Sequence, residues 1–469
     1  MSDLQGEEGQ VSRVLAGRPA SWRLYNDTCS PPSSGLHVHM KEEPVMRGRT
    51  MLLSGVLFVA TVLSAGPGVR AQPAGGGMQL EGVQLLFDLI ATIVGENPGY
   101  TDTLAALSGL DDAAAGREFD RLAQRNRDNP RISNAIDNLF ATDTYRFYFS
   151  RFRNVTPDIF RTAFVNLPYR AVKSPGGIAS CFLELCGNVD AVRAWKDDVV
   201  LRIDLNRCAA NAKRWLPAGD YPPVTIYFIY DSNAGSFTAG GRPFFNLLSM
   251  IGEFSGTGDL ASRLREIDVD AMEAVIAHEM NHVYARPVLY PPGREFDEWQ
   301  DGWLDRIVRG IVSEGVAGQC NPCTGFKKEL WEDPAVIARL IGSLNETGIA
   351  MYAGTMDDEA VTAWYRATFN QSARLLLEEY LRKRYDEPEA KRLFRAYISF
   401  RPDLLHTLGW WMVSRITRDQ ALPERGVNLL VDPCSLFDRY NDTLGDGADS
   451  LRVDPLLTER ARVLLTGSN

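Results

Sequence analysis

The sequence predicts an α+β fold that is rich in helix, with a small sheet ahead of the helix that carries His278 and His282. Two observations predict this class. Apolar residues recur at helical spacing over most of the chain after residue 78. By contrast, Val224–Tyr230 consists almost entirely of β-branched and aromatic residues, as a buried strand does. The chain has 469 residues, 45% of them hydrophobic, which is enough for a sizeable core.

The first 71 residues resemble a targeting region. Residues 1–45 show no periodicity, so we expect a non-native or disordered extension with translation beginning at Met46. Residues 46–71 combine two arginines, the apolar run Met51–Ala65 and a small-residue cleavage site ending at Ala71, which is the pattern of a signal peptide. The run is shorter than the roughly 20 residues that span a bilayer. We therefore expect an exported protein, periplasmic or extracellular, without stable membrane insertion; an uncleaved anchor is the alternative.

Cysteine usage agrees with export. Six cysteines follow the predicted cleavage site: Cys181, Cys186, Cys208, Cys320, Cys323 and Cys434. An even number in an oxidising compartment predicts disulfides, and we expect pairs close in sequence. Cys320-Asn-Pro-Cys323 suits a tight turn closed by a structural bridge, whereas a redox dithiol or a cysteine zinc site are the alternatives.

The pattern along the chain predicts two regions. Residues 78–216 are expected to form a helical N-terminal region, including residues 190–215, although residues 199–205 also alternate as a strand does. Pro217 marks the expected start of a second domain over residues 217–469. In that domain, Val224–Tyr230 is the clearest strand and Arg242–Met250 is a candidate second strand.

Long helices are expected in the rest of the second domain, around residues 335–345, 358–385 and 404–416. The formal net charge is -10, and the sequence contains no long run of Lys or Arg residues. Proteins that bind nucleic acid usually carry a basic stripe, so no nucleic-acid partner is expected.

The motif His278-Glu279-Met280-Asn281-His282 carries the chemistry. Residues four apart lie on one face of a helix, so both imidazoles can bind a single zinc ion. Glu279, beside the first histidine, is placed to remove the proton of the attacking water as general base. We expect this helix to begin at Asp268 or Asp270 and to end at Pro287. A surface helix with two incidental histidines is the alternative.

A catalytic zinc site needs a third protein ligand and one open position. The metzincin continuation does not supply it, because Ala285 and Val288 stand at its Gly and His positions. Glu314, 32 residues after His282, lies on the inward stripe of a predicted helix. A buried carboxylate is costly unless it meets a cation. The sequence thus predicts one Zn²⁺ bound by His278, His282 and Glu314; a surface or capping glutamate is the alternative for Glu314.

The developing oxyanion also needs a hydrogen-bond donor. His406 is the leading catalytic candidate, since no other histidine remains after the predicted cleavage site and Gly409 would let its helix come close. A capping or core histidine is the alternative role, and Tyr284 and Tyr397 are alternative donors. The neighbouring Trp410-Trp411 pair is expected to pack in the core, and a platform for the substrate is the alternative.

With these residues in place, the chain from Val224 to Met412 resembles a family of predicted zinc-dependent peptidases of unknown function. The resemblance rests on the motif 278–282, on Ser313-Glu314-Gly315-Val316-Ala317 and more loosely on residues 406–412. It implies zinc and a zincin-like catalytic domain of the gluzincin type, the group that includes thermolysin-like enzymes. These enzymes place an acidic residue four positions after the glutamate ligand, where this chain has Gly318. The hydrogen-bond partner of the histidines is therefore unassigned.

Together these features predict an exported zinc metallopeptidase that hydrolyses peptide or protein substrates. Residues 235–248 are a candidate edge on which an extended peptide could lie. Three other functions remain open: a zinc-dependent amidase acting on a non-peptide or cell-wall substrate, a non-catalytic binding protein that a metal stabilises, and a thiol oxidoreductase based on Cys320 and Cys323. The carboxylate of Glu279 argues against the binding protein, because a structural zinc does not need it.

Overall fold

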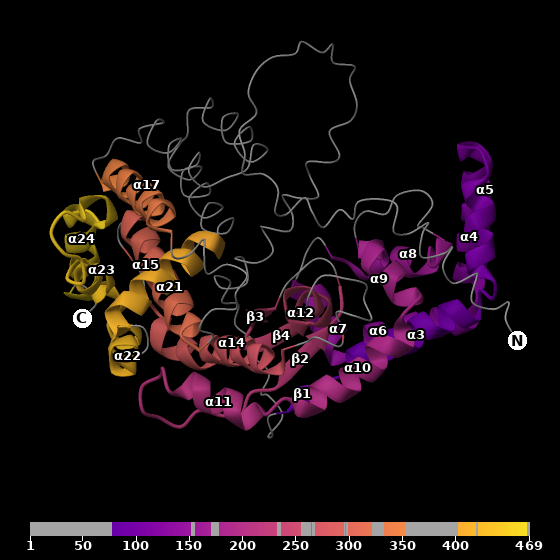
Figure 1. Cartoon of the computed structure of the whole chain (residues 1–469), viewed down its shortest axis with the longest axis horizontal. Helices are drawn as coiled ribbons and strands as arrows, with labels where there is room; N and C mark the ends of the chain where they lie inside the picture. Colours follow the sequence, from indigo (N-terminus) through magenta and orange to yellow (C-terminus); the bar gives the residue numbers. More distant parts are fainter. Residues whose placement is uncertain are drawn as a thin grey trace, which may run out of the picture. The chain divides into compact units, whose positions relative to one another are not determined.

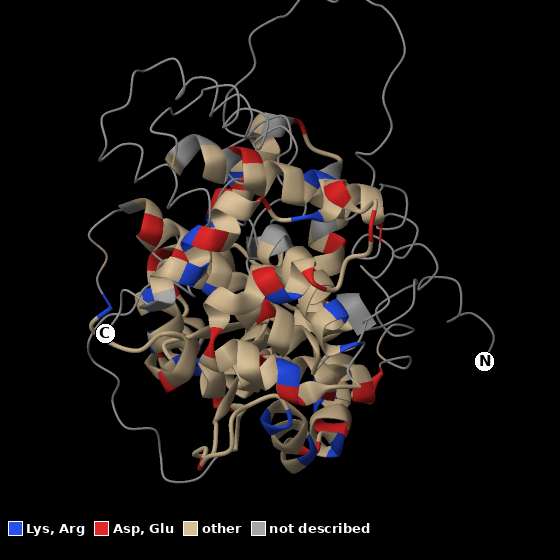
Figure 2. Cartoon of the chain, turned by 90° about the vertical axis from the view of Figure 1, so that its left-hand side faces the viewer, with Lys and Arg blue, Asp and Glu red and all other residues tan. Residues whose placement is uncertain are grey.

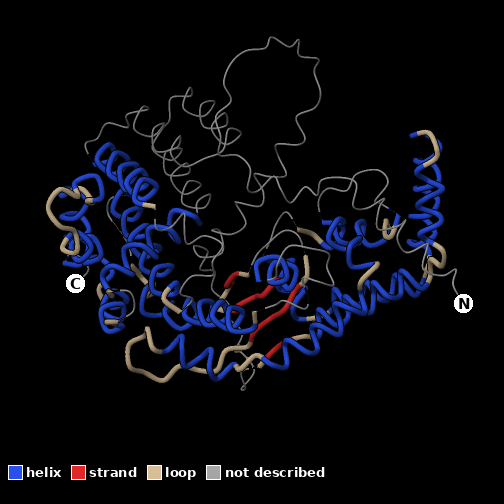
Figure 3. The backbone as a smooth tube through the Cα atoms, viewed as in Figure 1, coloured by secondary structure: helices blue, strands red, loops and turns tan. Residues whose placement is uncertain are grey.

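Helices dominate the computed structural model, and four short strands form one sheet (Figure 3). The structure describes residues 77–151, 155–169, 178–231, 236–254, 264, 268–294, 296, 299–320, 333–352, 402–418 and 421–466. All of these belong to one compact unit, Met46–Asn469. The predicted α+β class is confirmed. No helix in the described ranges is both long and apolar enough to cross a membrane.

The N-terminal part is helical, as predicted, apart from one strand. Its elements are β1 (Met78–Gln79), α3 (Glu81–Gly95), α4 (Tyr100–Ser108), α5 (Asp112–Asp128), α6 (Pro130–Ala141), α7 (Asp143–Arg151), α8 (Pro157–Val165), α9 (Ile178–Cys186), α10 (Val189–Arg202) and α11 (Leu205–Lys213). The ambiguous stretch 190–215 forms two helices. The break lies where Asp204 caps α11 by accepting hydrogen bonds from the backbone N–H groups of Asn206 and Arg207.

The sheet consists of β1, β2 (Ile226–Ile229), β4 (Arg242–Asn246) and β3 (Phe237–Ala239), in this spatial order. Neighbouring strands are parallel except β3, which pairs antiparallel with β4 through a turn in which Gly240 and Gly241 both have positive φ. The predicted strand 224–230 is confirmed. Residues 242–250 form a strand only to Asn246, because its side chain accepts the N–H of Leu248 and helix α12 (Leu247–Phe254) begins.

Three helices carry the predicted site and lie side by side: α14 (Val269–Leu289), α15 (Trp299–Gly318) and α21 (Pro402–Thr417) (Figure 1). Asp268 caps α14, as predicted, by accepting the N–H of Ala271. The expected end at Pro287 is wrong, since α14 continues to Leu289. A proline in the last turn removes only one backbone hydrogen bond, which this long packed helix tolerates.

The remaining described elements follow these helices in the C-terminal half. They are α17 (Pro334–Tyr352), α22 (Pro423–Val431), η3 (Pro433–Ser435), α23 (Leu436–Asn441), η4 (Asp449–Leu451) and α24 (Pro455–Thr466). The predicted helices around 335–345 and 404–416 are confirmed by α17 and α21. The predicted helix 358–385 lies outside the described residues.

Two glycines let α15 and α21 meet backbone to backbone. A Cβ added to Gly315 would lie 2.4 Å from the carbonyl oxygen of Gly409, and one added to Gly409 would lie 2.6 Å from that of Ile311. Real side chains do not approach backbone so closely, and only glycine allows this crossing. The close approach expected at Gly409 is confirmed, and it brings the helix of His406 against the helix of Glu314.

The expected disulfides are absent among the described cysteines. Cys181, Cys186, Cys208, Cys320 and Cys434 are buried free thiols, and Cys323 lies outside the described residues. Cys181 and Cys186 lie on one helix, where residues five apart have Cα atoms about 8–9 Å from each other. That separation exceeds the roughly 7 Å that a disulfide can bridge. Burial also raises the pKa of the Cys320 thiol, which disfavours the thiolate of a redox centre.

Positively and negatively charged residues are interspersed along the described helices (Figure 2). Many form ion pairs within or between neighbouring helices, such as Arg462 with Asp438 and Arg193 with Asp88. The pattern is that of an ordinary solvated surface.

Candidate metal centre

Helix α14 brings two imidazoles together in its middle. His278 and His282 lie one helical turn apart, and their ring planes are nearly perpendicular, with centroids separated by 4.7 Å. The Nε2 atoms of the two rings are 3.0 Å apart. Both side chains are largely buried and line one pocket, so their nitrogens converge on a shared interior point.

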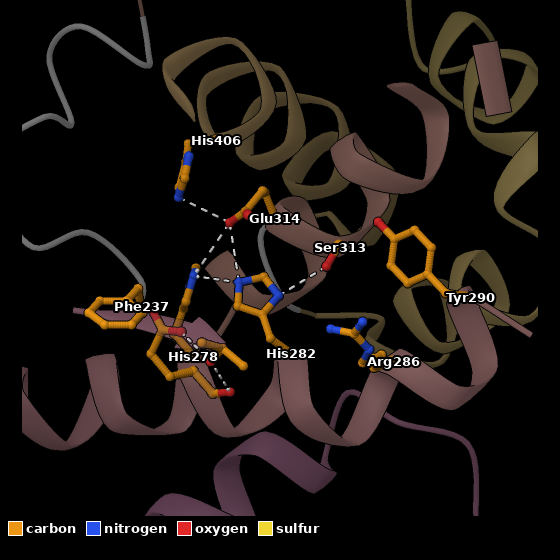
Figure 4. A pocket seen from close by; sticks show the side chains of 10 residues that line it. Phe237, His278, His282, Arg286, Tyr290, Ser313, Glu314 and His406 are labelled. Carbon is orange, nitrogen blue, oxygen red and sulfur yellow. Dashed lines mark hydrogen bonds and ion pairs between the residues drawn. The ribbon is translucent and has the colours of Figure 1, made fainter. Parts of the chain in front are cut away.

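Helix α15 adds the carboxylate that the sequence predicts. Glu314 is 6% exposed, and its Oε2 lies 3.5 Å from His278 Nε2 and 3.3 Å from His282 Nε2 (Figure 4). The structure therefore brings together three side chains from two helices, as the spacing of the sequence motifs led us to expect.

The spacing of these three atoms matches the requirements of zinc. A tetrahedral ion bound at about 2.0–2.1 Å needs ligand atoms roughly 3.3–3.4 Å from one another. The three pairs here are separated by 3.0, 3.3 and 3.5 Å. Glu314 Oε2 is buried and receives no hydrogen bond of regular geometry within the described chain. A cation bound between these atoms would satisfy this oxygen and both nitrogens, so the residues fit a divalent ion.

His406 reaches the same carboxylate from α21. Its Nε2 lies 3.0 Å from Glu314 Oε2, and its ring is parallel to that of His278 at a centroid distance of 6.3 Å (Figure 4). The ligand atoms of His278, Glu314 and His406 lie within 4.8 Å of one another, which makes a second possible set. The set with His282 is tighter, and its spacing is the one that suits a single tetrahedral ion.

His282 and Glu314 have shifted pKa values in this cluster. Burial raises the pKa of Glu314, but the surrounding His406, His282 and His278 lower it well below its usual range. Burial lowers the pKa of His282, and the charge of Glu314 more than offsets this and raises it to about 9. The carboxylate is thus ionised in this environment, as a metal ligand must be.

Glu279 lies beside the three predicted ligands and lines the same pocket. Its side chain is buried, and its Oε2 accepts a hydrogen bond of 2.6 Å from the hydroxyl of Thr238. Thr238 belongs to β3, the strand at one end of the sheet order. The small sheet therefore holds the carboxylate of the motif helix in position.

Ser313 is a hydrogen-bond partner that the sequence left unassigned. Its Oγ lies 2.9 Å from His282 Nδ1. When Nδ1 donates this bond, the lone pair of the ring is on Nε2, which faces His278 and Glu314. Gly318, at the position of the missing acidic residue, packs instead against Trp410.

Replacing Ser313 by Ala is expected to weaken zinc binding about 10- to 100-fold, because the imidazole of His282 loses its orienting hydrogen bond. Competition with a chromophoric chelator measures the affinity. Ser343→Ala is the matched control, since Ser343 is also buried in a helix and its hydroxyl donates to the backbone carbonyl of Arg339. Equal zinc affinity of both variants would exclude this role of Ser313.

Several pocket residues escaped the reading of the sequence. Besides the five predicted residues His278, Glu279, His282, Glu314 and His406, the pocket is lined by five that were not assigned to the site: Phe237, Thr238, Arg286, Tyr290 and Ser313. Of the alternative donors, Tyr284 packs against Tyr221 and Lys213, and Tyr397 lies outside the described residues. The sequence did contain a signal for Arg286: it lies four residues after His282, as His282 lies four after His278, so all three share one face of the helix. Thr238 had no such signal.

Comparisons with known proteins agree with this geometry. A family model described as "Putative zinc dependent peptidase (DUF5700)" matches residues 136–444. The chain therefore belongs to this family, and the resemblance noted in the sequence is confirmed. No curated protein and no solved structure matches the chain.

Proposed function

We propose that this member of the family is an exported zinc metallopeptidase, with one ion held by His278, His282 and Glu314. The observation that carries the proposal is the 3.0–3.5 Å spacing of their three ligand atoms, with the Glu279 carboxylate in the same pocket. When bound by these three residues, a zinc ion would supply Lewis-acid chemistry, which would polarise a substrate carbonyl and activate water near neutral pH.

Glu279 acts as the general base in this proposal. It accepts a proton from the attacking water and delivers it to the leaving amine, which completes hydrolysis of the peptide bond. Thr238 donates to Oε2, and Oε1 has no hydrogen-bond partner among the described residues. That oxygen is thus available for proton transfer, while the bond to Thr238 holds the carboxylate in one orientation.

His406 is proposed as the donor that stabilises the oxyanion, since its imidazole faces the same pocket from the third helix. Its contact of 3.0 Å with Glu314 also favours a second candidate, in which His406 is a fourth ligand. Four protein ligands would close the site and make the metal structural. This is the non-catalytic binding protein that the sequence left open.

Strand β3 favours a peptide over other amides as the substrate. Among the described strands it pairs only with β4, on one side, and Thr238 connects it to Glu279. An extended peptide that paired with the other side of β3 would pass beside the general base. A non-peptide amide would not use this backbone pairing.

Metal analysis and proteolysis of a diverse peptide library test the proposal together. We expect one zinc per chain and cleavage that a chelator abolishes and zinc restores. Substitution with Co²⁺ distinguishes the second candidate, because a closed site gives a visible spectrum that does not change when peptide is added. A stoichiometric metal without any cleavage would support the structural site and overturn the peptidase.

A further inference from the structure

Arg286 brings a positive charge into the candidate active site. It lies four residues after His282 on α14, so helical periodicity places it on the same face one turn further along. It lines the same pocket as His282 and Ser313, and Figure 4 shows its side chain together with theirs. In the described part of the chain, the guanidinium of Arg286 makes no hydrogen bond or ion pair. A half-buried guanidinium of this kind is costly unless a ligand supplies an anion.

The acidic residues of the pocket do not neutralise Arg286. Glu279 is bonded to Thr238, and Glu314 faces the imidazoles. A second arginine lies within electrostatic range of Arg286, because burial and then the charge of Arg286 lower the pKa of Arg151. This end of the pocket therefore favours an anion.

Tyr290 supplies a second donor close to Arg286, at the C-terminal end of α14. Its hydroxyl is buried and has no hydrogen-bond partner among the residues that the structure describes, and it points toward the same pocket (Figure 4). Burial, followed by the charge of Glu314, raises its pKa, so the phenol keeps its proton and remains a donor. The guanidinium of Arg286 and the hydroxyl of Tyr290, neither of which has an acceptor within the described ranges, thus line the pocket of the predicted ligands.

We propose that Arg286 and Tyr290 bind a carboxylate of the substrate, either the C-terminal carboxylate of a peptide or the side chain of Asp or Glu. The inference rests on the proposed function and specifies its substrate class. A guanidinium presents two parallel N–H groups that match the two oxygens of a carboxylate, and a phenol can add a third bond. The scissile bond then lies near an acidic group, at a distance set by one turn of α14.

Four versions of one cleaved peptide test this proposal and separate the two sources of the carboxylate. The versions combine a free or amidated C-terminus with Asp or Asn near the scissile bond. We expect kcat/KM to fall about 10- to 100-fold when the recognised carboxylate is removed. A fall in kcat/KM on amidation identifies the terminal carboxylate, and a fall on replacing Asp by Asn identifies the side-chain carboxylate.

Variants assign this preference to the two residues. Arg286→Met should bring the ratio between acid and amide peptides close to one, and Tyr290→Phe should reduce it. Arg202→Met is the control, because Arg202 pairs with Asp198 on the surface of α10, and it should keep the ratio. Tyr290→Phe removes a single oxygen and provides the test if Arg286→Met does not fold. An unchanged ratio in both variants would overturn the proposal, as would equal rates for all four peptides.

Binding measurements distinguish failure of this inference from failure of the peptidase. Zinc-loaded Glu279→Gln protein is titrated calorimetrically with the same peptides, and we expect a similar ratio of Kd values that Arg286→Met removes. Carboxylate-dependent binding without hydrolysis by the unmodified protein would keep this site and exclude the peptidase. Hydrolysis that does not depend on any carboxylate would keep the peptidase and exclude this site.

Discussion

Replacing Glu279 by Gln is expected to lower kcat for peptide hydrolysis by a factor of about 10²–10⁴, which is the usual contribution of a general base. Gln has nearly the same shape and can still accept the hydrogen bond from Thr238, but it cannot take a proton from water. The zinc content should remain at one ion per chain, because Glu279 is not among the three proposed ligands. Steady-state kinetics and metal analysis of the same preparation measure both quantities.

Glu81→Gln is the control for this variant, since Glu81 is an exposed glutamate in the first turn of α3. It should leave kcat and zinc content unchanged. Turnover of Glu279→Gln at the rate of the unmodified protein would remove Glu279 from the mechanism. Loss of zinc from Glu279→Gln would instead indicate that this carboxylate contributes to metal binding.

The substitution Asp305→Ala is expected to cost about 3–5 kcal/mol of folding free energy, because it leaves a buried guanidinium without its anion. Asp305 and Arg309 have side chains only 7% and 4% exposed, and Nε of Arg309 lies 2.8 Å from both carboxylate oxygens. Arg294 reaches the same carboxylate at 3.2 Å. Urea unfolding of the purified variant measures the loss.

An exposed ion pair provides the comparison for Asp305. Asp438 likewise accepts hydrogen bonds from one arginine, three of them from Arg462, but this pair lies at the surface. Asp438→Ala should therefore cost less than about 1 kcal/mol. If both variants lose the same small amount, burial of the Asp305 pair does not govern its contribution.

The buried pair also matters for the active site. Arg309 donates a hydrogen bond to the carbonyl oxygen of Leu289, the last residue of α14. Tyr290 follows directly, so the pair holds the end of the helix that presents Arg286 and Tyr290. We expect Asp305→Ala to weaken recognition of acidic peptides along with stability.

The predictions that succeeded depend on local repeats. The four-residue spacing of His278 and His282 places both on one face of any helix, whatever surrounds it. Glu314 could be located because its position in the apolar stripe of its own helix marks it as inward-facing. The strand after Val224 was equally clear, since its residues suit a buried pleated chain.

The errors arose where a contact between distant segments overrides a local signal. Met78 and Gln79 form a strand only because they pair in parallel with β2, which is distant in the sequence. Pro287 does not end α14, since packing sustains the helix beyond it. The even count of cysteines suggested disulfides, but Cys181 and Cys186 face different sides of one helix.

By itself the sequence determined which side chains could share a helical face and which glutamate points inward, because these properties follow from the 3.6-residue period of a single helix. Only the tertiary structure decided which of these groups meet. The contact of Gly315 with Gly409 sets the distance between two helices, and with it the meeting of Glu314 and His406. The bonds of Thr238 and Ser313 likewise join residues 41 and 31 positions apart, and such pairings depend on packing that no local pattern encodes.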